Sequence, residues 1–208
     1  DQTMNKINIP ESYIKKAVGP ACEWDDNIID AFLKTPRHRF LDEAMLKMAY
    51  LDDALPIGYG QTISKPSTVA YMTKMLEIDE SHTCLEIGTG SGFQAAILSK
   101  LCKTVYSVER VPELHRRSYQ IIKRIPLRNV KMRLQPYILG WPEFGPFDRI
   151  IATAEGKVVP QELIDQLAEG GLMLVPASGK LMRVTKKDGE VTITPLAECS
   201  LVDFVGAG

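Results

Sequence analysis

The sequence predicts an α/β protein whose doubly wound, mostly parallel sheet is preceded by N-terminal helices and ends in an antiparallel C-terminal edge. From residue 83 onward, apolar β-rich runs alternate with segments of helical periodicity. Such alternation produces a parallel sheet with helices on both faces. Late in the chain, Asp188-Gly189 separates two further β-rich runs, which is a strong signal for a hairpin.

The elements follow from local signals. Two helices are expected early, one after Pro10 and one over 25–33, where acids occupy the first turn and Thr35-Pro36 ends the helix. Residues 55–66 hold two prolines and two glycines without periodicity, so we expect a shaped loop, with Pro66 opening the next helix. The expected elements after that helix are strands at 83–87, 104–108, 130–134, 147–152 and 171–176, helices at 93–101, 111–124 and 160–168, and a hairpin of 180–186 with 191–194.

No repeat, low-complexity tract or linker divides the 208 residues, so a single domain is expected. We expect an N-terminal helical and loop part at about 5–80, a ligand-binding core at about 81–176 and a C-terminal hairpin part at about 177–208.

Composition excludes several function classes. With 25 basic and 26 acidic residues, no overall field favours nucleic acid or an anionic membrane, and the basic run 116–124 is spaced like the wet face of a helix. No apolar segment is long enough to span a bilayer and no signal-peptide pattern opens the chain. We expect a cytoplasmic location and, separately, a monomer. The thiols are scattered and the histidines share no ligand spacing with them, which predicts reduced cysteines and no metal; these residues are Cys22, Cys84, Cys102, Cys199, His38, His82 and His115.

The most informative stretch is 85–92, a strand end followed by a G-x-G-x-G turn that opens a helix. Glycines at 88, 90 and 92 allow a sharp turn and the close approach of a ligand to the backbone. The spacing differs from the G-x-G-x-x-G of dinucleotide binders, and Glu86 precedes the turn. This combination suits a nucleoside ligand without a diphosphate, where the acid can meet a cationic group. The alternative is a plain tight turn between a strand and a helix.

A second acid, Glu109, ends the next predicted strand roughly 20 residues after the turn, where doubly wound sheets place the carboxylate that accepts ribose hydroxyls. The alternative is a solvated acid at a strand end or in the N-cap region of the following helix.

The glycine turn with its acid resembles the first motif of class I S-adenosylmethionine-dependent methyltransferases. Further motifs are Pro36-Arg37-His38-Arg39-Phe40, Leu55-Pro56-Ile57-Gly58, Gly60-Gln61-Thr62-Ile63-Ser64, Val108-Glu109-Arg110, Gly140-Trp141-Pro142 and Pro146-Phe147-Asp148-Arg149-Ile150-Ile151. With these motifs the chain resembles protein-L-isoaspartate O-methyltransferase over roughly residues 5 to 206. The Gly60 to Ser64 loop is specific to this family, whereas the glycine turn is common to many methyltransferases.

The resemblance implies a Rossmann-like methyltransferase fold and methyl transfer from S-adenosylmethionine to the free carboxylate of L-isoaspartyl residues in damaged proteins and peptides. The ester then cyclises to a succinimide that partly reopens to normal aspartate. It implies Ser64 as the active-site serine, although an ordinary turn or capping serine is the structural alternative. The expected cofactor-binding residues are Thr62, Ile63, Glu86, Gly88, Thr89, Gly90, Gly92, Glu109 and Gln135.

The chain departs from the family at Gln135-Pro136-Tyr137, where Gly-Asp-Gly is usual and the aspartate meets the adenine amino group. No acid occurs between Glu113 and Glu143, so no shift in alignment restores that carboxylate. The Gln135 carbonyl is a possible replacement, through a neutral and weaker hydrogen bond. Two further departures are Glu155-Gly156-Lys157, in place of small apolar residues, and 201–204, in place of Phe-Val-Pro-Leu.

Three interpretations remain open from the sequence. We favour an isoaspartyl methyltransferase with an altered adenine pocket. The others are a carboxyl methyltransferase with a different acceptor and a non-catalytic binding protein that kept the fold. A nucleic-acid methyltransferase is disfavoured, because Ala152-Thr153-Ala154 stands where amino-methylating enzymes carry Asn/Asp-Pro-Pro-Tyr.

Overall fold

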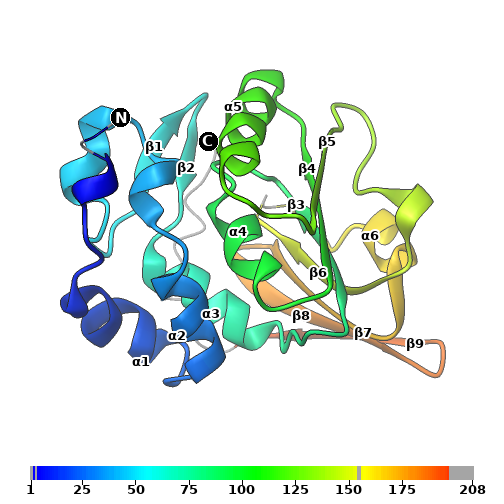
Figure 1. Ribbon diagram of the computed structural model, residues 1–208. Coiled ribbons are helices and arrows are strands. Elements are labelled where there is room, and N and C mark those ends of the chain that lie inside the picture. The colour runs from blue at the N-terminus through cyan, green and yellow to red at the C-terminus, as the bar shows by residue number, and fades with distance from the viewer. Residues whose placement is uncertain (1, 3, 154–155, 197–208) are drawn as a thin grey trace.

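The computed structural model describes residues 2, 4–153 and 156–196 (Figure 1). Cys199 and the sequence departures at Glu155 and 201–204 lie outside the described residues. In the part of the chain that is described, none of the helices combines the length and apolarity needed to cross a bilayer.

A seven-stranded sheet forms the centre of the molecule, with the strand order β5-β4-β3-β6-β7-β8-β9. The first five strands in this order are parallel and the last two pairings are antiparallel, as the sequence predicts. The chain runs from β3 outward to β4 and β5 and returns to the other side of β3, so the strand order reverses there. In open α/β sheets, ligands bind at the carboxyl ends of the strands at such a point. The strands are β3 (Thr83–Ile87), β4 (Thr104–Glu109), β5 (Val130–Leu134), β6 (Phe147–Ala152), β7 (Leu167–Ala177), β8 (Lys180–Lys187) and β9 (Glu190–Pro195).

Successive side chains of a strand point to opposite faces of the sheet, and here both faces carry apolar side chains. Helices therefore cover both faces. One core packs Cys84 and Val105 of the sheet with residues of α4 (Phe93–Ser99) and α5 (Pro112–Arg124). The other packs Leu85 and Ile150 with Leu163 of α6 (Gln161–Asp165). Figure 1 shows α4 and α5 together and α6 apart from them, across the strands.

The expected N-terminal helices are present. The first is helical from residue 11 to 21 and includes the π-helix Tyr13–Val18 and α1 (Gly19–Ala21). The second, α2 (Asp26–Leu33), is capped by Asp25, whose carboxylate accepts hydrogen bonds from two backbone amides of the first turn. Pro66 opens α3 (Pro66–Met75). The 3₁₀ segments are Met4–Lys6, Arg37–Phe40, Glu43–Met48 and Pro142–Phe144.

Two sequence expectations are wrong in detail. The loop 55–66 contains an antiparallel hairpin of β1 (Leu55–Gly58) and β2 (Gln61–Ile63), because three successive residues, 58–60, adopt positive φ and reverse the chain. The helix expected over 160–168 ends at Asp165, and β7 begins at Leu167 instead of 171. Tertiary contacts set this boundary, since the Gln166 carbonyl accepts a hydrogen bond from Phe147 N and its side chain bonds to the segment 139–141.

Candidate active site

The glycine turn lies at the carboxyl end of β3 and is tied to β4. The amides of Gly88 and Thr89 both donate to the Val108 carbonyl, at 2.9 and 3.1 Å. Gly88 has φ +92°, and a Cβ there would lie 2.8 Å from Thr153 Oγ1. Both the backbone conformation and the neighbouring side chain therefore require glycine at this position.

Glu109 is held at the turn by two backbone amides. Its Oε1 accepts from Gly90 N and its Oε2 from Val111 N, both at 2.9 Å, and the residue is 5% exposed. The alternative of a solvated acid at a strand end is therefore wrong. Each carboxylate oxygen has lone pairs beyond the one used here, so the group can accept further hydrogen bonds without moving.

Glu86 is fully buried next to the turn in a short chain of hydrogen bonds. Ser107 Oγ donates to Glu86 Oε1 at 2.6 Å, and the hydroxyls of Thr89 and Ser107 also lie 2.6 Å apart. Glu86 Oε2 has no hydrogen-bond partner among the described residues. Burial raises the pKa of this carboxyl to about 8, against a smaller lowering by the Ser107 hydrogen bond. At neutral pH the carboxyl is therefore mostly protonated.

Gln135 follows β5 directly and joins the same end of the sheet. Its backbone amide donates to the Glu109 carbonyl at 2.8 Å, and its side-chain Nε2 donates to the Gly140 carbonyl at 3.1 Å. The amide nitrogen is thus committed to the protein, and the Oε1 end is the one left for a ligand. Tyr137, two residues further along the chain, is 97% exposed.

The hairpin β1–β2 brings the Ser64 loop to the glycine turn. A Cβ at Gly90 would meet Ile57 Cδ1 at 3.8 Å, so the β1 side chain lies beside the turn. Arg117 of α5 donates to the Ile57 carbonyl at 3.1 Å, and Figure 1 shows the hairpin alongside α5. On β2, Ile63 is buried and Thr62 is exposed; Ser64, which follows it, is half-buried.

Arg37 fixes the end of this hairpin, a role that the sequence did not indicate. The side chain is fully buried and donates to three backbone carbonyls, those of Ala49 at 2.7 Å, Asp53 at 2.8 Å and Ser64 at 3.1 Å. Its position in the Pro36 to Phe40 motif was visible in the sequence. Its contacts, however, join segments up to 27 residues away, and no local pattern indicates them.

The sequence-predicted residues thus gather at the carboxyl ends of β3, β4 and β5, with the hairpin beside them. Gly88, Thr89, Gly90 and Gly92 form the turn. Glu109 bonds to it directly through Gly90 N, Glu86 is connected to it through the Ser107 hydroxyl, and Gln135 is connected to it through the Glu109 carbonyl. The hairpin with Thr62, Ile63 and Ser64 approaches through Ile57. Among the described residues no group of three or more His, Cys, Asp or Glu side chains is arranged to hold a metal ion.

The chain is similar to known proteins over most of its length. The family model for protein-L-isoaspartate(D-aspartate) O-methyltransferase matches residues 13–207. A protein-L-isoaspartate O-methyltransferase of Desulfotalea psychrophila is 44% identical over 182 residues, covering 86% of this chain and 85% of the relative. One of Parvibaculum lavamentivorans is 47% identical over 154 residues, covering 74% of this chain and 69% of the relative.

Solved structures show the same fold. A protein-L-isoaspartate O-methyltransferase with 29% identity superposes with a TM-score of 0.79, covering 93% of this chain and 65% of the other. A Plasmodium falciparum structure described as a complex with S-adenosyl-L-homocysteine has 24% identity and a TM-score of 0.77, covering 92% and 95% of the two chains. On the extent of the family match and the identity to these relatives, the chain belongs to the protein-L-isoaspartate(D-aspartate) O-methyltransferase family.

Proposed function

We propose that this protein transfers the methyl group of S-adenosylmethionine to the free carboxylate of L-isoaspartyl residues in damaged proteins and peptides. Family membership supports this reaction. The observation that carries it is the placement of Glu109, which two amides hold at the mouth of the glycine turn, beside the hairpin that leads to Ser64. We also expect a monomer in the cytoplasm, and the free, buried thiols of Cys22, Cys84 and Cys102 support the reducing compartment.

The residues present fit this cofactor. The turn at Gly88 to Gly92 lets a ligand approach the backbone, and Glu109 would accept the ribose hydroxyls. Glu86 Oε2, which is buried and has no hydrogen-bond partner in the described part of the chain, would accept hydrogen bonds from the cationic amino group of the methionine part. Ile63 and Thr62 would cover the ligand from the hairpin. When bound, the cofactor supplies a methyl group that its sulfonium charge has already activated.

The acceptor carboxylate is already a nucleophile at neutral pH, so the protein needs no general base. One carboxylate oxygen forms the new bond to the methyl carbon while the carbon–sulfur bond breaks toward sulfur, giving a methyl ester and a neutral thioether. Aligning the reacting atoms can contribute up to roughly 7–11 kcal/mol. Ser64 would donate a hydrogen bond that orients the carboxylate without protonating it, and Arg37 would hold the Ser64 backbone through its carbonyl.

For the adenine, we propose that Gln135 replaces the aspartate that the family usually carries. Its Nε2 is bound to Gly140 O, so the Oε1 is oriented as an acceptor for the adenine amino group. A neutral acceptor gives a weaker hydrogen bond than a carboxylate, about half as strong.

The test is a methyl-transfer assay on paired peptides that differ only in an aspartyl or isoaspartyl residue, combined with calorimetry of cofactor binding. Methylation of the isoaspartyl peptide alone is the expected result. Methylation of other carboxylates would indicate a different acceptor, and an absence of cofactor binding would indicate a binding protein.

Ser64→Ala should lower the rate of methyl transfer to the isoaspartyl peptide while leaving cofactor affinity nearly unchanged, because the hydroxyl would contact the acceptor and not the adenine. Equal rates for the variant and the original protein would make Ser64 a turn residue.

A further inference from the structure

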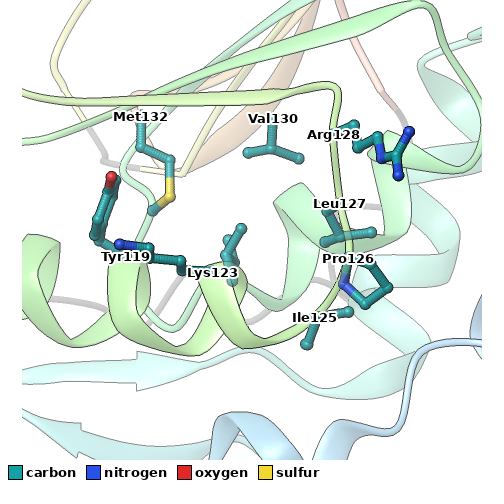
Figure 2. Close-up of a pocket in the computed structure, with 9 residues that line it drawn as sticks. Tyr119, Lys123, Ile125, Pro126, Leu127, Arg128, Val130 and Met132 are labelled. Atoms are coloured by element: carbon teal, nitrogen blue, oxygen red, sulfur yellow. The ribbon is translucent and has the colours of Figure 1, made fainter.

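A groove between α5 and β5 lies outside the site described above. It lies between the C-terminal half of α5 and β5, the edge strand of the sheet, and has a volume of about 330 Å³. Figure 2 shows Val130 and Met132 of β5 on one side, Tyr119 and Lys123 of α5 facing them, and the segment 125–128 closing one end. We call this the α5–β5 groove; its lining residues are Tyr119, Ile122, Lys123, Ile125, Pro126, Leu127, Arg128, Val130 and Met132.

The β5 side of the groove presents a strand edge that pairs with no other strand among the described residues. The Val105 amide donates to Asn129 O and the Gln135 amide donates to Glu109 O. The backbone N–H and C=O groups of the odd-numbered residues of this segment therefore point toward β4. In a parallel pair the intervening residues direct their N–H and C=O groups the other way. The backbone groups of Val130, Met132 and Leu134 therefore point to the free edge, where an extended chain can pair with them.

The groove is also basic. The segment from residue 114 to 142 contains no acid. Arg116, Lys123, Arg124, Arg128 and Lys131 are exposed, and none of them forms an ion pair with another described residue. Lys123 and Arg128 line the groove itself, whereas Lys131 lies on the opposite face of β5, with its ammonium 5.6 Å from the centre of the Tyr106 ring.

We propose that the α5–β5 groove binds an extended segment of the substrate polypeptide that is rich in acidic and aliphatic residues and distinct from the isoaspartyl residue. Three properties fit this occupant: an unpaired strand edge for the backbone, an apolar floor of Ile122, Val130 and Met132 for aliphatic side chains, and flanking cations for carboxylates. The edge leads to the candidate active site, because Gln135 directly follows Leu134. The assignment of the segment to a substrate rests on the proposed function.

The binding test uses a fluorescein-labelled decapeptide of alternating glutamate and valine, and a matched peptide of alternating glutamine and valine, titrated with the full chain and followed by fluorescence anisotropy. We expect the glutamate peptide to bind at least fivefold more tightly, and the difference to shrink as salt is added. Equal affinity for the two peptides would overturn the proposal.

Three variants locate the binding. Lys123→Glu and Arg128→Glu should each weaken binding of the glutamate peptide at least fivefold. Lys131→Glu introduces the same charge change on the opposite face of β5 and should weaken it less than twofold. Equal weakening by all three variants would mean that net charge alone attracts the peptide. A DNA oligonucleotide that binds equally tightly and displaces the peptide would mean the same. Either result contradicts the proposal that the groove binds the peptide.

A fourth variant tests the strand edge. Val130→Pro removes a backbone N–H that points away from β4, at the first residue of the strand, where proline is tolerated. Binding of both peptides should weaken several-fold while the thermal unfolding temperature of the protein stays close to the original. An unchanged affinity would exclude strand pairing. Self-association of Lys123→Glu and Arg128→Glu would itself block the groove. If these variants lose peptide binding only because they self-associate, the function of the two cations is to prevent aggregation at the strand edge, and the proposal is wrong.

The groove and the proposed function can fail separately. The probe peptides contain no isoaspartyl residue and need no cofactor, so their binding is measured whether or not methyl transfer occurs. In the activity assay, Lys123→Glu should raise the KM of an isoaspartyl peptide with a glutamate–valine extension and leave its kcat and the KM of the unextended peptide unchanged. Binding of the probe without methylation of either substrate would refute the proposed function and leave the groove as a binding site.

Discussion

Glu86 makes the stability of this fold depend on pH in a direction opposite to that of most carboxylates. Burial raises its pKa from 4.5 to about 8 in the folded protein, so folding takes up a proton between these values. The contribution of this group to stability is fully present below about pH 4.5 and is lost as pH rises toward 8. The loss is at most about 1.4 kcal/mol per pH unit and flattens near each of the two pKa values, so it amounts to roughly 3 kcal/mol between pH 5 and pH 8.

Replacing Glu86 by glutamine keeps the shape of the side chain and removes the titration. The free energy of unfolding, measured by urea denaturation of both proteins at pH 5, 6, 7 and 8, should fall with pH more steeply in the original protein than in Glu86→Gln. The variant should therefore gain about 3 kcal/mol relative to the original protein across this range. Other groups that titrate, including the buried His38, are common to both proteins and cancel in the difference.

The absolute stability of Glu86→Gln at one pH is not the test, because the new amide also needs partners at the position of Oε2. The test is how the difference in unfolding free energy between the two proteins changes with pH, because only this change depends on the titration of the carboxyl. Parallel curves for the two proteins would show that Glu86 titrates at an ordinary pKa, and the account of the buried acid would then be wrong.

The same acid predicts a proton release on cofactor binding. If Glu86 accepts the cofactor ammonium, that cation favours the ionised carboxylate, so nearly one proton should be released at pH 7 and affinity should rise toward pH 8. Calorimetry in two buffers of different ionisation enthalpy measures the release, which Glu86→Gln should abolish.

The remaining predictions concern the turn, the adenine pocket and the hairpin. Glu109→Ala should weaken cofactor binding at least tenfold, since hydrogen bonds to a charged group contribute roughly 1.5–3 kcal/mol each; unchanged affinity in calorimetry would exclude the ribose role. Gln135→Ala should weaken cofactor binding and Pro136→Asp should leave it unchanged if Gln135 has rebuilt the pocket, whereas tighter binding of Pro136→Asp would indicate a degraded one. Arg37→Met leaves three carbonyls without their donor and should cost about 3 kcal/mol of unfolding free energy or more, measured by urea denaturation; a loss below about 1 kcal/mol would show that water replaces the guanidinium.

The order of elements and the position of the candidate ligand site could be predicted from the sequence alone, because both predictions depend on local signals. The glycine turn needs residues without a Cβ, helix starts need caps such as Asp25, and parallel strands need apolar runs separated by helices. The spacing from the turn to Glu109 reflects one strand–helix–strand unit, so the acid was placed correctly at the strand end. The family resemblance then added Ser64 and Gln135, which no periodicity indicates.

Only the tertiary structure decided which groups these residues meet. Residues 55–63 form a hairpin because the turn at 58–60 closes and Ile57 packs beside Gly90, and α6 ends early because Gln166 bonds to a distant loop. The protonation of Glu86 depends on its complete burial, and the three carbonyls around Arg37 come from separate segments. A hydrogen bond or a desolvated charge depends on atoms that are distant in the chain, and folding is what brings those atoms together.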